Sequence, residues 1–252
     1  MWRDDPRARG AVVSILESAA ERLADRRPGA LAVMVPTGPR ALFDEVGNLL
    51  EGGLPSDVAD QVAAAVPDLI SAETSRLVPA GTSEVFVEVL VPPPRLLLFG
   101  AGPIGEAVCA AAAAAGFVVE VGDPRPAFAL SERFPAAAVV RCGWPDQLIA
   151  QQVVDSATYI VSVLHEARFE DELLPAVLRS PARYLGALGS RRTHAARVAR
   201  LRSQGFSDED LERISAPVGL PIGAATPEEI AVAIVAEMVA VRRGVTPPGA
   251  TR

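Results

Sequence analysis

The chain has 252 residues, of which 50% are hydrophobic and only 5% aromatic. This length and apolar content suit either one large domain or two modest ones. The 24 basic and 31 acidic residues give a net charge of −7 without any basic run, which argues against a nucleic-acid partner.

The beginning of the chain is acidic, and no long apolar span follows it. We therefore expect a cytoplasmic protein that neither carries a signal peptide nor crosses a membrane. Cys109 and Cys142 are the only cysteines, and they lack the spacing of metal ligands. This argues against a disulfide framework and against a metal site.

The first third of the chain predicts a small domain that contains both helices and strands. Apolar residues at helical spacing predict a helix over 7–23, and a buried strand follows at 30–35. Ser56 can cap a helix that reaches residue 70, and alternation predicts a strand at 83–90.

Three consecutive prolines at 92–94 mark a domain boundary, because they hold the chain extended. We expect a smaller N-terminal α/β domain over 1–91 and a second domain over 92–252. In the second domain, strand-like runs alternate with helix-forming stretches, which predicts a Rossmann-like parallel sheet with helices on both faces. The runs are 96–99, 118–121, 138–141, 159–163 and 184–187.

A G-x-G-x-x-G loop follows the first of these strands and opens a predicted helix. In that context Gly100 permits a tight turn, Gly102 lets a pyrophosphate approach the backbone, and Gly105 lets the helix lie close to the strand. Free amides at the helix start would then meet the phosphates, so Pro103 and Ile104 join the predicted contacts. The alternative is that a βα turn merely favours glycine.

Asp123 ends the second strand, where a ribose-binding acid is expected. Its carboxylate would repel a 2′-phosphate and so favours a ligand without one, although the positive charge of Arg125 can partly offset this repulsion. The alternative makes Asp123 a cap at the strand end. His165 follows the fourth strand, at the ligand-binding edge, and is a candidate acid, base or phosphate donor. Its alternative is a histidine bonded to a neighbouring carbonyl or to Glu166.

Ser190 and Arg191 follow the fifth strand at the start of a helix, which favours an anion site. The alternative makes Ser190 an N-cap and the arginines solvated charges, and it accounts equally well for Arg192 and His194. Further on, a glycine-rich loop at 219–225 leads into a helix whose capping box is Thr226 and Glu229.

These motifs together resemble the XdhC/CoxI family, the accessory proteins of molybdenum hydroxylases such as xanthine dehydrogenase and carbon monoxide dehydrogenase. The resemblance covers about 150 residues. It is carried by the glycine loop, Gly122 to Arg125 with Phe128, Arg133 to Pro135, His165-Glu166, Tyr184 to Thr193, and Gly219 to Glu237.

The resemblance implies a carrier and insertion chaperone rather than an enzyme with its own turnover. The implied cofactor is molybdopterin cytosine dinucleotide, and the implied partner is a molybdenum hydroxylase of the xanthine or CO dehydrogenase type. Whether the protein forms a homodimer stays an open question. Physically the cofactor fits, because its pyrophosphate and ribose are groups that the glycine loop and Asp123 are suited to hold.

The first half departs from the family pattern. Arg26 to Ala30 resembles the family's Pro-Arg-x-Pro-Gly-Ala segment, but the family's cysteine-bearing segments are absent, and Pro79 to Thr82 stands where the last of them would be. If thiolates there hold molybdenum or sulfur, this chain lacks them. An NAD(P)-dependent oxidoreductase, with His165 or Tyr159 in proton transfer, therefore stays an alternative. A nucleotide-sensing domain without catalysis is the third.

Overall fold

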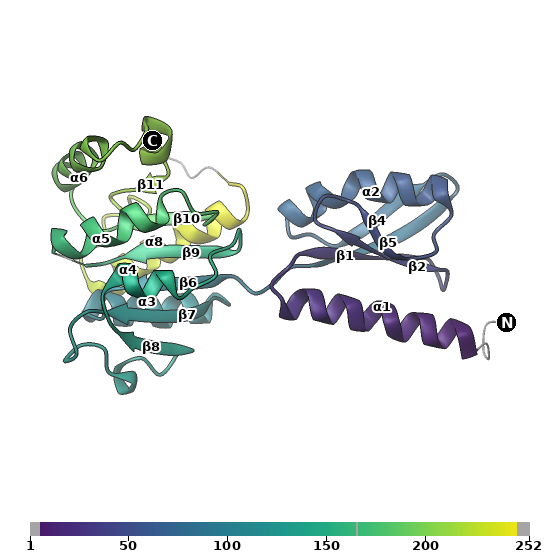
Figure 1. Cartoon of the computed structure of the whole chain (residues 1–252), viewed down its shortest axis with the longest axis horizontal. Helices are drawn as coiled ribbons and strands as arrows, with labels where there is room; N and C mark the ends of the chain where they lie inside the picture. Colours follow the sequence, from purple (N-terminus) through teal and green to yellow (C-terminus); the bar gives the residue numbers. More distant parts are fainter. Residues whose placement is uncertain (1–5, 165, 246–252) are drawn as a thin grey trace. The chain divides into compact units, whose positions relative to one another are not determined.

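A computed structural model describes residues 6–164 and 166–245 of the chain. It divides into two compact units, Met1–Pro92 and Pro93–Arg252 (Figure 1). No helix among the described residues is both long enough and apolar enough to span a bilayer.

The first unit is a five-stranded antiparallel sheet with one helix on each face (Figure 1). Its strand order is β3-β2-β1-β5-β4, and every neighbouring pair runs antiparallel. In chain order the elements are α1 (Pro6–Ala24), β1 (Gly29–Met34), β2 (Arg40–Asp44), β3 (Leu49–Gly52), α2 (Ser56–Ser71), β4 (Arg76–Ala80) and β5 (Ser83–Leu90).

Alternation along the strands divides the first unit into two apolar layers. Ala30, Ala32 and the inward residues of β5 face α2, whose Val58, Val62 and Val66 are buried. Leu31 and Leu42 face the other way and pack on Ile15 and Ala19 of α1. The predicted helices and the strands β1 and β5 are confirmed, whereas Pro55, not Ser56, is the N-cap of α2.

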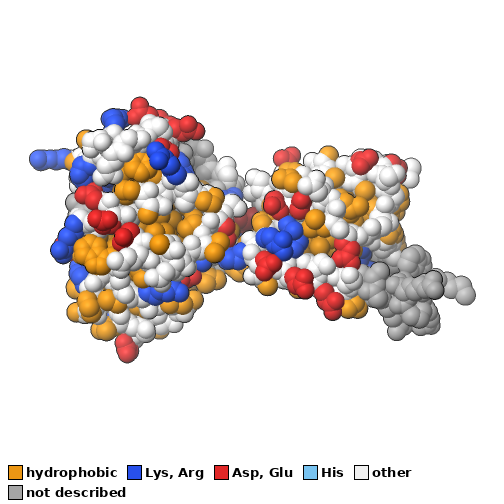
Figure 2. Space-filling model, viewed as in Figure 1, with side chains coloured by type: hydrophobic (Ala, Val, Ile, Leu, Met, Phe, Trp, Pro, Cys, Tyr) orange, Lys and Arg blue, Asp and Glu red, His pale blue; other side chains and the backbone are white. Residues whose placement is uncertain are grey.

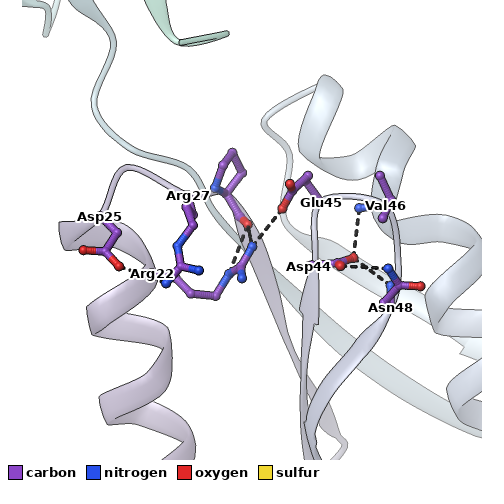
Figure 3. A network of polar contacts seen from close by, with 8 residues as sticks. Arg22, Asp25, Arg27, Asp44, Glu45, Val46 and Asn48 are labelled. Carbon is purple, nitrogen blue, oxygen red and sulfur yellow. Dashed lines mark hydrogen bonds and ion pairs between the residues drawn. The ribbon is translucent and has the colours of Figure 1, made fainter. Parts of the chain in front are cut away.

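The turn between α1 and β1 is held by Arg22 near the end of α1 (Figure 3). Its guanidinium donates to the carbonyl of Pro28 and lies 2.8 Å from the Glu45 carboxylate. A Cβ on Gly29 would lie 2.8 Å from the Phe43 carbonyl oxygen, so the chain passes too close for a larger residue. The Pro-Gly-Ala segment noted in the sequence thus has a packing role.

The second unit is a six-stranded, fully parallel sheet with the order β11-β10-β9-β6-β7-β8. Its first half comprises β6 (Arg95–Phe99), α3 (Pro103–Ala114), β7 (Val118–Asp123), a short 3-10 helix (Ser131–Arg133), β8 (Val139–Cys142) and α4 (Pro145–Ala150). Its second half comprises β9 (Thr158–Ser162), α5 (Ala167–Val177), β10 (Tyr184–Ala187), α6 (Arg191–Ser203), α7 (Asp208–Glu212), β11 (Ile214–Ser215) and α8 (Pro227–Arg242).

Helices cover both faces of this sheet, which confirms the predicted fold class. One apolar layer joins the sheet to α3 and α8 through Val108, Ala112 and Ile234, among others. The opposite layer joins it to α4 through α7, with Leu173 of α5 and Leu201 of α6 as fully buried members. The strand β6 is buried along its whole length, because layers lie on both sides of it.

The strand order places a switch point between β6 and β9. The chain moves outward from β6 to β7 and β8, then returns to build β9, β10 and β11 on the other side of β6. In such sheets the crevice at the carboxyl ends of the two central strands is the usual place for a ligand. The glycine loop after β6 and the turn after β9 both lie at this point.

Candidate functional site at the carboxyl edge of the parallel sheet

The three glycines of the loop after β6 meet different surroundings. Gly100 has φ of 116°, a left-handed backbone that favours glycine, and a Cβ there would lie 2.9 Å from Val163. A Cβ on Gly105 would lie 2.0 Å from the carbonyl oxygen of Gly100. By contrast, a Cβ on Gly102 would meet nothing within 4 Å. Gly100 and Gly105 therefore shape the turn, and Gly102 faces open space.

The helix that follows begins without a side-chain cap. Gly102 is its N-cap, which makes no side-chain cap bond, and Pro103 occupies its first turn. Ile104 is half-buried against the core and holds this first turn on the sheet. Unpaired N–H groups and the helix dipole together favour an anion at this position.

Asp123 ties the glycine loop to the end of β7. Its side chain is completely buried, and Oδ2 accepts the N–H of Ala101 at 2.7 Å. Arg125 donates its backbone N–H and its Nε to Oδ1, both at 2.9 Å, and its Nη2 to Oδ2 at 2.8 Å. Both oxygens are therefore engaged by protein donors, and contact with a ribose stays a prediction.

The same contacts set the charge state of this pair. Burial alone would raise the pKa of Asp123, but the hydrogen bonds from Arg125 and Ala101 and the Arg125 charge hold it below its usual value. The hydrogen bond to Asp123 in turn raises the pKa of Arg125. Asp123 and Arg125 thus form an ion pair over the ordinary pH range.

Arg125 also stacks on an aromatic ring beside the loop. Its Cζ lies 4.1 Å from the centroid of Phe128, and that of Arg133 lies 5.4 Å from it. Arg133 pairs with Glu106 in the first turn of α3. Arg133 therefore holds the segment after β7 against the start of α3, while Arg125 stacks on the same ring and pairs with Asp123.

His165 lies outside the described residues, so its predicted role stays a prediction. Its neighbour Glu166 is the N-cap residue of α5 but makes no side-chain cap. The Glu166 carboxylate lies 2.8 Å from Arg168, and its charge also acts on Arg125. Glu166 therefore interacts with the charges of two basic side chains, Arg168 and Arg125.

At the end of β10, Ser190 is the N-cap of α6, and its hydroxyl accepts the N–H of Thr193 at 3.1 Å. Arg191 and Arg192 are exposed. His194 is partly buried, and its Nδ1 has no partner among the described residues. Burial and the charge of Arg197 lower the pKa of His194, so the ring is neutral near pH 7.

The loop before α8 ends in the predicted capping box, with the Thr226 and Glu229 side chains each bonded to the other's backbone N–H. Further along α8, Glu237 accepts the N–H of Gly219 at 2.8 Å and the hydroxyl of Tyr184. The start of the loop is thereby fixed, while Ile222 in its middle is 56% exposed.

The structure brings together the glycine loop, Asp123 and Arg125 through the Ala101 hydrogen bond. Ser190 and Arg191 lie at the same edge of the sheet, but at the end of β10, which β9 separates from β6. Sequence reasoning missed a buried ion pair, Glu170–Arg197, beneath this second turn. Its signal was that Arg197 lies one helical turn before Leu201, on the buried face of α6.

The two cysteines are unpaired thiols. Cys109 is buried in α3, where desolvation raises the pKa of its thiol to about 11, and Cys142 is exposed at the end of β8. Within the described ranges, 6–164 and 166–245, no cluster of three or more His, Cys, Asp or Glu side chains could hold a metal ion.

These features define a two-domain protein whose second domain is of the Rossmann type, with its glycine loop at the switch point of the sheet. The family model for the XdhC Rossmann domain matches residues 96–238, more than half of the chain. The chain therefore belongs to the XdhC family, and the resemblance found in the sequence is confirmed.

Two curated relatives agree with this assignment. A probable xanthine dehydrogenase subunit of Bacillus subtilis (strain 168) is 35% identical over 164 residues, which cover 65% of this chain and 48% of that protein. The molybdenum cofactor insertion chaperone PaoD of Escherichia coli (strain K12) is 30% identical over 148 residues, covering 59% of this chain and 40% of that protein. In each match, less than half of the relative's length is covered.

Among solved structures, a xanthine dehydrogenase from Bacillus halodurans superposes with a TM-score of 0.72 over 93% of this chain and 68% of that chain. The two sequences are 22% identical in this alignment, so the likeness concerns the fold. It extends beyond the residues that the family model matches and includes most of the first unit.

Proposed function

We propose that this chain is an accessory protein that binds the molybdenum cofactor and delivers it to a molybdenum hydroxylase. Family membership supports this, as do the names of relatives, one an insertion chaperone for that cofactor and one a probable component of xanthine dehydrogenase. The partner would be a hydroxylase of the xanthine or CO dehydrogenase type. The work would take place in the cytoplasm, in keeping with two unpaired thiols.

The observation that carries the proposal is the start of α3. Gly102 leaves open space where any other residue would place a side chain, and the amides behind it have no side-chain cap. A pyrophosphate is the group that best matches such a helix start, because several N–H donors converge on its oxygens. This fits the cytosine dinucleotide form of molybdopterin, in which a pyrophosphate joins the pterin to the nucleotide.

In this proposal the residues of the chain bind and orient the cofactor. The amides of the glycine loop hold the phosphates, and the Asp123–Ala101 bond fixes the loop beforehand. Arg125 offers the guanidinium edge that Asp123 does not use, at a site that is 35% exposed. The bound cofactor supplies the molybdenum chemistry, which takes place in the hydroxylase after delivery.

The test is to identify what the whole chain carries after purification from a molybdenum-replete host. Denaturation and oxidation should release a fluorescent pterin and a cytosine nucleotide, identified by mass spectrometry, in near-equal amounts. Gly102→Val should abolish both, because its side chain would occupy the phosphate position. Gly53→Val is the matched control, since a Cβ at Gly53 also meets nothing within 4 Å but lies in the first unit.

A wild-type protein without pterin would refute the proposal, as would a Gly102→Val protein that still carries it. Release of a nicotinamide dinucleotide instead would favour the oxidoreductase alternative. Delivery is tested separately, by mixing the loaded chain with a cofactor-free hydroxylase and measuring the activity that the hydroxylase gains.

A further inference from the structure

The helix α6 is attached to the sheet in an unusual way. Of its described residues only Arg197 and Leu201 are buried. Leu201 lies in the second half of the helix and belongs to the apolar layer shared with α5. The first two turns, which begin with Ser190 and Arg191, are therefore anchored by the side chain of Arg197.

Arg197 forms a bidentate ion pair with Glu170 of α5. Its Nη2 lies 2.9 Å from both carboxylate oxygens, and its Nε lies 3.2 Å from Oε2. The two side chains are 1% and 5% exposed. Figure 2 shows basic and acidic side chains spread over the visible surface of the protein. The Glu170–Arg197 pair differs from these because it is buried.

The same guanidinium also holds the turn after β10. Nη2 donates to the carbonyl of Leu188 at 2.8 Å, and the N–H of Leu188 donates to the carbonyl of Ser162 at 2.8 Å. Gly189 follows with φ of 139°, and a Cβ there would lie 3.1 Å from Thr193 and 3.5 Å from Arg197 Nη2. The Arg197 side chain thus links α5 and α6 to the end of β10, and the backbone N–H of Leu188 continues the connection to the end of β9.

Stability alone does not explain this pair. Burial raises the pKa of Glu170 even with Arg197 beside it, which indicates a desolvation cost that the ion pair does not fully offset. Arg197 Nη1 also lacks an acceptor among the described residues. Apolar residues of similar size often serve as well as a buried ion pair, whereas a planar guanidinium fixes several acceptors in one geometry.

We propose that Glu170 and Arg197 are positioning residues, which hold the turns after β9 and β10 at the separation that the bound ligand requires. The proposal rests on the proposed function, since the ligand is the cofactor held at the glycine loop. It assigns a role to two residues that would not touch the cofactor themselves.

The test compares Arg197→Met, Glu170→Met and the double variant in the whole chain. Three quantities are measured: the Tm, the amount of copurified pterin, and amide hydrogen exchange at 163–170 and 187–194. Each single variant should have a lower Tm than the double variant, because it leaves one buried charge unpaired. The double variant should recover most of the Tm, yet carry less than a tenth of the wild-type pterin and exchange both turns at least tenfold faster.

The control is the Asp171→Met/Arg200→Met variant, which removes the second ion pair between the same two helices. That pair is 2.9 Å apart but more than a third exposed on each side. It should keep wild-type pterin and wild-type exchange. Arg197→Lys serves if the methionine variants do not fold, because lysine keeps the charge but cannot bond Glu170 and Leu188 in the same geometry. It should fold and carry at least threefold less pterin.

A double variant with recovered Tm, wild-type pterin and wild-type exchange would show that the pair is only structural and would overturn the inference. So would an Arg197→Lys protein with wild-type pterin. If the wild-type chain carries no pterin, the proposed function fails. Hydrogen exchange in the two turns then decides the positioning role on its own: faster exchange in the double variant supports it, and unchanged exchange overturns it.

Discussion

The Asp123 carboxylate accepts the backbone N–H of Ala101 at 2.7 Å, which joins the end of β7 to the glycine loop. Asp123 is fully buried, and its other partner is Arg125, which donates from both its backbone N–H and its guanidinium. The acid that the sequence marks as a ribose contact therefore also holds the glycine loop in place.

Asp123→Asn should loosen this turn. An amide loses the charge-assisted bonds to Arg125 and Ala101, so the free energy of unfolding should fall by about 1.5–3 kcal/mol. Urea denaturation at pH 7 measures the change, and copurified pterin should fall with it. Glu132→Gln, at an exposed site, is the control and should change neither. An Asp123→Asn protein as stable as the wild type would contradict the role of this carboxylate.

Asp123 should also contribute to the pH dependence of stability. Its pKa in the folded chain lies below the value of about 3.9 that an aspartate has when unfolded. Its stabilisation is therefore complete above that value and is lost as the pH falls through the folded pKa. Between pH 7 and pH 3 the wild type should lose more unfolding free energy than Asp123→Asn. Parallel losses in the two proteins would argue against this assignment.

Alanine at two glycines of the loop should change stability to very different extents. Gly105→Ala places a Cβ 2.0 Å from the Gly100 carbonyl oxygen and should cost about 1–3 kcal/mol of stability or more. Gly102→Ala meets no atom and should change stability by less than about 0.5 kcal/mol while lowering pterin content. Chemical denaturation of both variants checks this, and equal losses would contradict the different surroundings of the two glycines.

Ser190 offers a way to separate capping from ligand contact. Ser190→Ala removes the cap of α6 and should cost about 1 kcal/mol. Ser190→Asp keeps a capping oxygen and adds a negative charge, so stability should stay near the wild-type value. If this turn contacts an anion, Ser190→Asp should nevertheless carry less pterin. Wild-type pterin in a stable Ser190→Asp protein would leave Ser190 as a cap alone.

Arg191 and Arg192 form a matched pair, since both are exposed in the first turn of α6. Substitution of either by alanine should change stability by no more than about 0.5 kcal/mol. Arg191→Ala should lower pterin content, and Arg192→Ala should not, because we expect only Arg191 to contact the anion. Equal pterin content in the two variants would remove Arg191 from the site.

The sequence predicted the parallel sheet because its central strands are continuous apolar runs, such as Leu96 to Phe99, between glycine-rich turns. It did not reveal β2, β3 and β4. All three are short: β2 buries only Ala41 to Phe43, β3 is mostly exposed, and β4 contains Pro79, so none shows a long apolar run or a long alternation in the sequence. Each of them nevertheless pairs with a neighbour in the chain, β2 with β1 and β3, and β4 with β5 across a tight turn.

Only part of the candidate site could be predicted from the sequence. A glycine loop has a local geometric cause, so its spacing can be recognised along the chain. The partners of Asp123 and the burial of Arg197 depend on packing between separate elements. An arginine in an arginine-rich helix resembles a surface residue until α5 is placed over it.

The close contact between Gly105 and Gly100 has a consequence for affinity. Because α3 already rests against the turn, and Asp123 already braces it, the loop has little freedom left to lose when a ligand arrives. A preorganised binding site loses less conformational entropy on binding, so more of the interaction energy contributes to affinity. If the proposed function holds, a small number of backbone contacts from this loop would suffice to bind the cofactor.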